Sequence, residues 1–264
     1  MMTMTPDQIQ EAVRILLGAR RDHRTIEALP EACRPRTVEE GYAIQDALVR
    51  ASGARVSGWK LGSTTPYWQK RAGLTEPMAG RLLETMLHRG SATFAGAHFH
   101  LRMVECEYAF ELGRDLPPRA EPYRREEVED AVAAVYGAIE VADSRYAKGL
   151  IVETPSLIAD NVLTGAYLVG PEIARWRDVD LTNAPVRVFV DGKQINEGKG
   201  ENTGGHPILP LVWLANDRRR RGDGLAAGML ISTGSTTGAY RSPLNADITA
   251  EFSDFGTMQL TFTA

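Results

Sequence analysis

The sequence predicts an α+β fold in which an N-terminal helical region precedes a larger, mostly antiparallel β body. Three observations carry this prediction. Two helix-capping motifs lie within the first 53 residues, short strand-like runs follow them, and glycine, proline and aspartate separate those runs. We therefore expect an N-terminal helical region at 1–53 and a β-rich domain at 54–264, built as one continuous structural unit.

Two helices are predicted in the N-terminal region. Thr5-Pro6-Asp7-Gln8 supplies an N-cap, a proline in the first turn and a glutamine at the third position, and Thr37-Val38-Glu39-Glu40 is a capping box. Apolar residues at helical spacing follow both motifs and give each helix one face to bury. They are Ile9, Ala12, Val13 and Leu16 in the first helix, and Tyr42, Ile44, Ala47 and Leu48 in the second.

The remaining elements are predicted from composition and turn signals. Asp191-Gly192 is a two-residue hairpin signal, and Ser253-Asp254-Phe255-Gly256 marks a wider turn. Further helices are expected at 67–73, 125–136 and 207–220. Strands are expected at 55–62, 103–112, 138–143, 166–169, 186–191, 194–197, 229–233, 246–252 and 257–263.

Composition and charge exclude several functional classes. The 264 residues are 43% hydrophobic, and 30 basic against 34 acidic residues give a net charge of −4, which does not favour nucleic acid or an anionic membrane. No apolar run reaches the ~18 residues of a spanning helix, and MMTMTPDQIQ lacks a signal peptide's apolar core. Cys33 and Cys106 are too few for a disulfide framework or a four-cysteine zinc site. We expect a cytoplasmic protein with no nucleic-acid or membrane partner.

An acidic pair gives the clearest chemical signal. In a strand over 103–112, Glu105 and Glu107 point to the same face, because alternate side chains do. Neighbouring carboxylates repel, and a hard divalent cation such as Mg²⁺ relieves that repulsion. A solvated strand face is the simpler interpretation of this pair.

A third carboxylate strengthens the metal interpretation. Glu140 lies in the apolar run 138–142, where an unpaired buried charge is costly and needs a metal, a basic partner or a proton. A salt bridge with Arg145 or an exposed helix position are the alternatives. If Glu140 joins the acidic pair, three carboxylates converge on one cation.

Lys60 stands in an apolar, glycine-punctuated strand, Gly58-Trp59-Lys60-Leu61-Gly62. Such a lysine can act as a base or hold an anionic substrate, and the alternative is an edge-strand lysine that extends into water. The run 230–238 ends in glycine, serine and threonine whose backbone N–H groups can bind a carboxylate. His206 can cap a helix or belong to a site, and His98 with His100 is a candidate metal pair or a polar strand face.

The order of these motifs resembles a known family. The chain contains GWKLGS at 58–63, VECEYAFEL at 104–112, AIEVADSR at 138–145, IADN at 158–161, GHP at 205–207 and STGS at 232–235. Together they are similar to the 2-keto-4-pentenoate hydratase/4-oxalocrotonate decarboxylase group of the fumarylacetoacetate hydrolase superfamily, over nearly the whole chain.

The resemblance implies the fold, the site and the partners. It implies a mixed β-roll core with an N-terminal helical cap, a homo-oligomer and, as an option, a complex with another enzyme of the pathway. It implies that Glu105, Glu107 and Glu140 hold Mg²⁺ or Mn²⁺ and that Lys60 is catalytic. The substrate-binding residues that it implies are Leu61, Gly62, Ser63, Asn161, Thr164, Gly234 and Ser235.

The implied activity is that of a hydro-lyase in aromatic-compound catabolism. A metal-dependent hydratase adds water to a 2-hydroxy-2,4-dienoate or 2-oxo-enoate and gives a 4-hydroxy-2-oxo acid. Decarboxylation of a 2-oxo-3-enedioate of the 4-oxalocrotonate type is the alternative. An acylpyruvate-type C–C hydrolase and a catalytically silent relative that binds a 2-oxo acid are further alternatives.

Two positions depart from the family pattern. Met78 stands in Glu76-Pro77-Met78-Ala79-Gly80, where similar hydratases carry an aspartate in a motif like E-P-D-F-G. Leu163 and Thr164 follow IADN and Val162, where the family carries two serines. Both changes make the expected pocket more apolar, and Met78 favours chemistry that needs no activated water or a different group that activates it.

Overall fold

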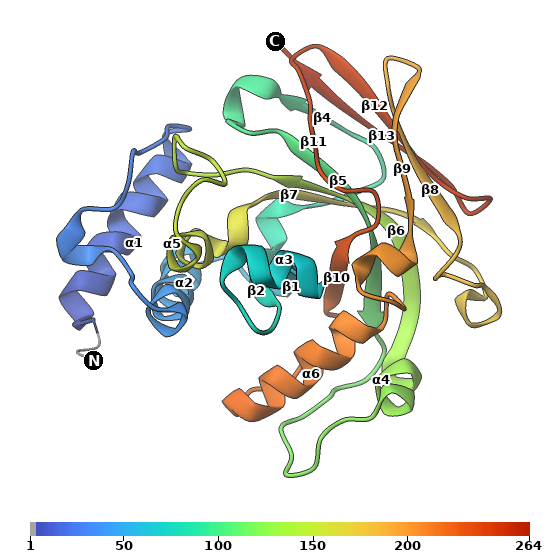
Figure 1. Cartoon of the computed structure of the whole chain (residues 1–264), viewed down its shortest axis with the longest axis horizontal. Helices are drawn as coiled ribbons and strands as arrows, with labels where there is room; N and C mark the ends of the chain where they lie inside the picture. The colour runs from blue at the N-terminus through green and yellow to red at the C-terminus, as the bar shows by residue number, and fades with distance from the viewer. Residues whose placement is uncertain (1–3) are drawn as a thin grey trace.

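The computed structural model describes residues 4–264 and contains two β-sheets with helices around them (Figure 1). Residues 1–3 of the N-terminal segment MMTMTPDQIQ lie outside this range. The larger sheet has the order β2-β1-β10-β5-β6-β7-β3, with β11 paired to β5. Its strands are β1 Val56–Gly62, β2 Met78–Leu83, β3 Leu87–Arg89, β5 Met103–Leu112, β6 Val132–Ala142, β7 Thr164–Glu172, β10 Leu230–Ser235 and β11 Tyr240–Arg241.

The smaller sheet has the order β4-β13-β12-β8-β9. Its strands are β4 Ala92–Ala95, β8 Pro185–Val190, β9 Lys193–Lys199, β12 Ala246–Phe252 and β13 Gly256–Thr263. Asp191 and Gly192 join β8 to β9 with positive φ angles of 49° and 77°, as the predicted two-residue hairpin requires.

Both sheets are mixed, with mostly antiparallel neighbours. The parallel pairs are β1 with β10, β3 with β7, and β4 with β13. The predicted α+β class with mixed sheets is therefore confirmed. Within residues 4–264, no helix is long and apolar enough to cross a bilayer.

The main core lies between the two sheets. Val104, Cys106, Tyr108 and Phe110, the apolar face that alternation predicts for β5, pack in one buried cluster with residues of β8, β12 and β13. Tyr108 meets Phe252 of β12 with ring centroids 6.3 Å apart. Helices α4 (Arg125–Ala131) and α6 (Leu209–Arg221) contribute to the same cluster. The opposite face of the large sheet is thereby left for the polar residues of the site.

Helices α1 (Pro6–Arg21), α2 (Val38–Ser52) and α5 (Thr154–Ala159) lie together at the end of the molecule away from the smaller sheet (Figure 1). Both predicted capping boxes form. Gly41 lets α2 approach α5 closely, because a Cβ there would lie 2.6 Å from the carbonyl oxygen of Pro155. The first two helices share a buried cluster with Tyr146 and Ala159, residues of the β-rich part of the chain.

The sequence misplaced or missed several elements. The helix predicted at 125–136 ends at Ala131, and residues 132–136 belong to β6 instead. Their backbones pair with β5, so tertiary strand pairing overrides local helix propensity. Strands β2, β3, β4 and β11 and helix α5 were not predicted. Each is short, so periodicity is a weak guide to it, whereas α3 (Pro66–Ala72) agrees with expectation.

A buried ion-pair network ties the helices to the β body. Asp160, fully buried, accepts hydrogen bonds from Arg20 Nη2 of α1 (3.0 Å) and from the backbone N–H of Arg145 (2.7 Å). Arg20 also donates to the carbonyl oxygen of Thr164 (2.8 Å), and Arg145 pairs with Asp143 (2.8 Å). Removing one charge from such a network leaves the others buried without compensation.

We expect Asp160→Ala to lower the free energy of unfolding by about 3–5 kcal/mol, because Arg20 and Arg145 lose their shared partner in the interior. Urea unfolding followed by circular dichroism measures this. The matched control is Glu11→Ala, which breaks an exposed ion pair with Arg14 and should leave the midpoint nearly unchanged. An equal, small effect of both substitutions would contradict the structural role of the network.

Candidate metal and catalytic site

Three carboxylates meet on one face of the large sheet. Antiparallel pairing of β5 with β6 places Glu105 opposite Glu140, and Glu107 lies two residues further along the same face. One carboxylate oxygen from each residue lies within 4.8 Å of the other two. The predicted convergence of three separate acidic residues is what the structure shows.

Burial makes this acidic cluster electrostatically costly. Glu107 and Glu140 are each 1% exposed, and Glu105 is partly buried. Burial, together with the negative charge of Glu140, raises the pKa of Glu105 to about 7 and holds the pKa of Glu107 well above its ordinary value. Lys60 opposes both shifts without cancelling them.

Lys60 supplies the positive charge of the cluster. Its Nζ lies 2.9 Å from Glu140 Oε1, and the residue is 5% exposed. Burial alone would lower the pKa of Lys60, but the charges of Glu140, Glu105 and Glu107 outweigh it and raise the pKa. Lys60 is therefore an ammonium group at neutral pH. The alternative salt bridge of Glu140 with Arg145 is not formed, because Arg145 pairs with Asp143 instead.

Strand alternation sorts the predicted residues between two faces. Lys60 shares its face with Gly62 and, across the parallel pair, with its register partner Ser232 on β10. Leu61 points the other way into the main core, so we withdraw its side chain from the predicted substrate-binding set. Gly62 and Ser63 end β1, and Ser63 adopts a left-handed φ of 53° where the chain turns away from the sheet.

The loop after β10 closes around the acidic pair. Gly234, at φ 96°, sits in a register shift between Ser232 and Ser235, and a Cβ there would lie 2.8 Å from Thr64 Oγ1. The shift turns Ser235 toward Glu105, where its hydroxyl opposes the rise in the carboxyl pKa. Thr236 fixes this loop with two hydrogen bonds of 2.8 Å to the carbonyl oxygen of Cys106, between the two glutamates.

A strained turn covers the edge of the site. Asn161, Val162 and Leu163 have consecutive φ angles of 55°, 51° and 63°, a left-handed run that costs about 1–3 kcal/mol per residue without glycine. The Asn161 amide accepts from the Arg81 N–H (2.7 Å) and donates to its carbonyl (2.8 Å). Thr164 Oγ1 donates to the Asn161 carbonyl (2.8 Å). The Asn161 side chain thus holds the turn on β2, and the Thr164 hydroxyl closes the turn itself.

Apolar groups lie beside Lys60 at the end of β1. Met78 of β2 is the register partner of Gly62, and a Cβ at Gly62 would be 3.2 Å from Met78 Cε and 3.3 Å from Val162 Cγ1. Gly80, the partner of Lys60, meets Asn161 and Val162 in the same way. Met78 and Val162 thus form an apolar wall beside Gly62.

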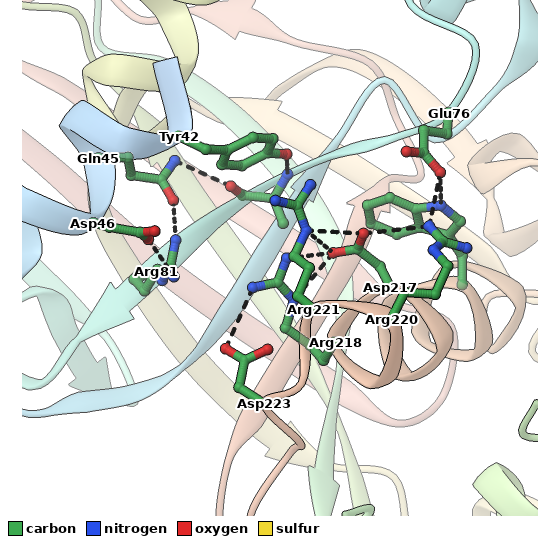
Figure 2. Close-up of polar contacts among 12 residues, drawn as sticks. Tyr42, Gln45, Asp46, Glu76, Arg81, Asp217, Arg218, Arg220, Arg221 and Asp223 are labelled. Carbon is green, nitrogen blue, oxygen red and sulfur yellow. Dashed lines mark hydrogen bonds and ion pairs between the residues drawn. The ribbon is translucent and has the colours of Figure 1, made fainter. Parts of the chain in front are cut away.

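Arginines at the C-terminal end of α6 contact the strand that carries Lys60. Trp59 is stacked between Arg81 and Arg218, whose guanidinium carbons lie 4.2 and 4.5 Å from its ring centroid. Figure 2 shows Arg218 and Arg221 meeting Asp217, while Tyr42 reaches the Ala79 N–H (3.0 Å). The sequence placed these arginines at a helix C-terminus without foreseeing this network.

The candidate histidines lie apart from the carboxylates. His98 stacks on His23 (ring centroids 4.0 Å apart) beside a cavity of 270 Å³ lined by Arg20 and Arg145. Among residues 4–264, the glutamate trio is the cluster that meets the geometry of a metal site. His206 Nδ1 accepts the N–H of Ile208 (3.1 Å), the residue before α6, so it bonds the chain ahead of the helix and does not cap the helix itself.

The cluster suits a divalent cation. Three carboxylates and one ammonium leave a formal charge of −2 when all are ionised, which a 2+ ion neutralises. Oxygen ligands of this type are the ones that Mg²⁺ and Mn²⁺ favour.

Comparison with known proteins places the chain in a family. Residues 75–263 match the model of the fumarylacetoacetate (FAA) hydrolase C-terminal domain. The chain belongs to the fumarylacetoacetate hydrolase family. The matched range contains all three glutamates, while Lys60 precedes it.

Individual relatives of this family cover most of the chain. A 2-keto-4-pentenoate hydratase of Paraburkholderia xenovorans is 34% identical over 88% of this chain and 86% of its own length. A 4-oxalocrotonate decarboxylase of a Pseudomonas species is 30% identical over 86% and 88%. The 4-oxalocrotonate decarboxylase of Pseudomonas putida G7, solved with magnesium and adipate, shares the fold with a TM-score of 0.91 at 24% identity, over 98% of this chain and 99% of that one.

We expect the metal-free protein to lose stability as pH rises from about 5 to 8. The folded pKa of Glu105, about 7, exceeds its ordinary 4.5, so its contribution is complete below pH 4.5 and is lost as pH rises through 7. Mg²⁺ should raise the thermal midpoint more at pH 8 than at pH 5.5, because protons compete with the cation. Scanning fluorimetry in EDTA or Mg²⁺ measures both effects, and an Mg²⁺ shift independent of pH would refute the assignment.

Proposed function

We propose that this member of the fumarylacetoacetate hydrolase family is a divalent-metal-dependent hydratase. It adds water to a 2-hydroxy-2,4-dienoate and releases a 4-hydroxy-2-oxo acid. The observation that carries the proposal is the joint burial of Lys60 and three carboxylates on one sheet face. The 34% identity to a 2-keto-4-pentenoate hydratase supports the substrate class.

Glu105, Glu107 and Glu140 hold Mg²⁺ or Mn²⁺ in this proposal. When bound, such a cation supplies a Lewis acid that polarises the 2-oxo group of a chelating substrate. The three carboxylates supply the negative charge that balances the cation. Because Glu107 and Glu140 are buried, bulk water does not screen the attraction between these charges.

Lys60 holds and moves protons. Its ammonium group lies next to the carboxylates, where it can pair with the carboxylate of a 2-oxo acid and donate a proton to the carbon chain. Water adds at C4 only when the C3–C4 double bond is conjugated with the 2-oxo group, so the first proton goes to C5. C3 then takes a proton after water has added at C4.

The loop residues bind the rest of the substrate. Gly62, Ser63, Gly234 and Ser235 lie at the ends of β1 and β10 around this face and leave backbone N–H groups and hydroxyls for the substrate carboxylate. Asn161 and Thr164 contribute indirectly, because Asn161 holds the left-handed turn against β2 and Thr164 closes the turn itself.

Decarboxylation of a 2-oxo-3-enedioate is the second candidate, and Met78 is the observation that favours it. A thioether beside Gly62 cannot activate water, whereas loss of carbon dioxide needs no activated water. The 30% identity to a 4-oxalocrotonate decarboxylase supports the same alternative.

We also propose that the chain forms a homo-oligomer. Helix α3 buries none of its residues and exposes Tyr67 and Trp68 by 62% and 55%. Paired exposed aromatic residues of this kind are enriched at protein interfaces.

The shared cluster of Tyr146 with α1 and α2 supports the expectation that 1–53 and 54–264 form one structural unit.

Product analysis separates the candidates. With Mg²⁺, 2-hydroxypenta-2,4-dienoate should lose its ultraviolet absorbance and yield a product heavier by one water, identified by mass spectrometry. Release of carbon dioxide from 2-oxo-3-hexenedioate, with no hydration of the dienoate, would identify the decarboxylase. Turnover of neither substrate would contradict both proposals.

Glu107→Gln should reduce turnover by at least about 100-fold, because it removes a ligand charge while preserving the shape of the side chain. Steady-state kinetics at several Mg²⁺ concentrations measure the loss, and circular dichroism checks the fold. Glu111→Gln is the matched control, since Glu111 lies on the same strand and bonds Tyr136 outside the trio. Unchanged turnover by Glu107→Gln would rule out its metal role.

A further inference from the structure

A tyrosine and a serine share the sheet face of the three carboxylates. Tyr167 of β7 is the register partner of Glu140, and Ser232 of β10 is the register partner of Lys60. Both residues are fully buried. The sequence did not predict Tyr167 for the site, whereas Ser232 lies in the run 230–238 that it offered for binding a carboxylate.

Several buried polar atoms in this layer lack a hydrogen-bond partner, and three of them concern us here. They are Tyr167 Oη, Ser232 Oγ and Glu107 Oε2, and each is shielded from solvent. Burying a hydroxyl or a carboxylate oxygen without a partner is unfavourable, so three such atoms in one layer point to hydrogen bonds among them. Each hydroxyl can donate one hydrogen bond and accept others, so a small shift of these side chains completes the bonds.

Small side chains give the tyrosine ring its space. Ala109 of β5 and Ala138 of β6 pack in one buried cluster with Tyr167. Because β6 and β5 lie between β7 and β10, a ring that extends over these alanines reaches toward Ser232. Glu107 is the register partner of Ala138, so its carboxylate lies beside this path.

The electrostatic environment keeps the phenol protonated. Burial, and after it the charge of Glu107, holds the pKa of Tyr167 well above its ordinary value, while the hydroxyl of Ser232 acts in the opposite direction. A protonated phenol donates one hydrogen bond and accepts others. Tyr167 can therefore donate to a carboxylate while it accepts from Ser232.

We propose that Tyr167 and Ser232 are positioning residues for the metal site. The Tyr167 hydroxyl donates to one oxygen of Glu107, and Ser232 donates to the phenol oxygen and fixes its direction. The other oxygen of Glu107 is then oriented toward Glu105 and Glu140. The inference rests on the proposed metal-dependent function, because it assigns Glu107 a ligand role.

Tyr167→Phe tests this proposal, because it removes the hydroxyl and keeps the ring. Isothermal titration of the metal-free protein with Mg²⁺ should show a Kd about 10–100-fold higher, the usual effect of losing a group that orients a ligand. The circular dichroism spectrum of the metal-free protein should be unchanged, because the ring that fills this part of the core is kept. Turnover should recover at saturating Mg²⁺, as expected of a positioning residue and not of a catalytic one.

Two further variants complete the test. Ser232→Ala removes the second hydroxyl at small cost in volume and should also weaken Mg²⁺ binding. Tyr136→Phe is the matched control: Tyr136 lies on the same face, but its hydroxyl donates to Glu111 (3.1 Å), so Mg²⁺ affinity should be unchanged.

The outcomes separate this inference from the proposed function. Unchanged Mg²⁺ affinity in Tyr167→Phe and Ser232→Ala, with binding abolished in Glu107→Gln, overturns the positioning role and leaves the metal site intact. Wild-type Mg²⁺ affinity in Glu107→Gln overturns the metal site itself. Equal weakening by Tyr167→Phe and Tyr136→Phe shows general loosening of the sheet face and also overturns the proposal.

Discussion

The mutual repulsion of three buried carboxylates is the constraint on which this structure depends. Glu105, Glu107 and Glu140 stand on a sheet face from which water is largely excluded, and Lys60 offsets only part of their charge. Such a cluster persists only if the surrounding fold holds it, since each member would gain solvation by moving apart. Much of the rest of the chain can be understood as the support that this arrangement requires.

That support comes from both faces of the large sheet. On the far face, the main core packs the sheet against the smaller one, and Trp59 is fixed between two guanidinium groups directly next to Lys60. On the near face, the left-handed turn at 161–163 lies against β2, held by Asn161 and by the buried network of Asp160. A strained backbone conformation of this kind persists only where surrounding contacts hold it in place. Such turns cluster at functional sites.

The wall beside Lys60 shows how the same scaffold can serve different chemistry. Met78 and Val162 bring a thioether and a branched aliphatic group to the end of β1, where a carboxylate would offer a proton acceptor. The charged cluster and this apolar wall come from different elements, so one can vary while the other is unchanged. Relatives that are named as hydratases and as decarboxylases, at 34% and 30% identity, are consistent with this division of roles.

The sequence by itself determined the local features of the fold. The capping boxes at Thr5 and Thr37, the Asp191-Gly192 hairpin and the alternation around Glu105 depend on residues close together in the chain, and all are present. The tertiary structure decided what depends on partners distant in sequence. Residues 132–136 form a strand because β5 pairs with them. The side chain of Leu61 lies in the core because the register of β1 places Lys60 on the opposite face. Tyr167 lies in this layer because strand order places β7 next to β6, and no local pattern encodes strand order.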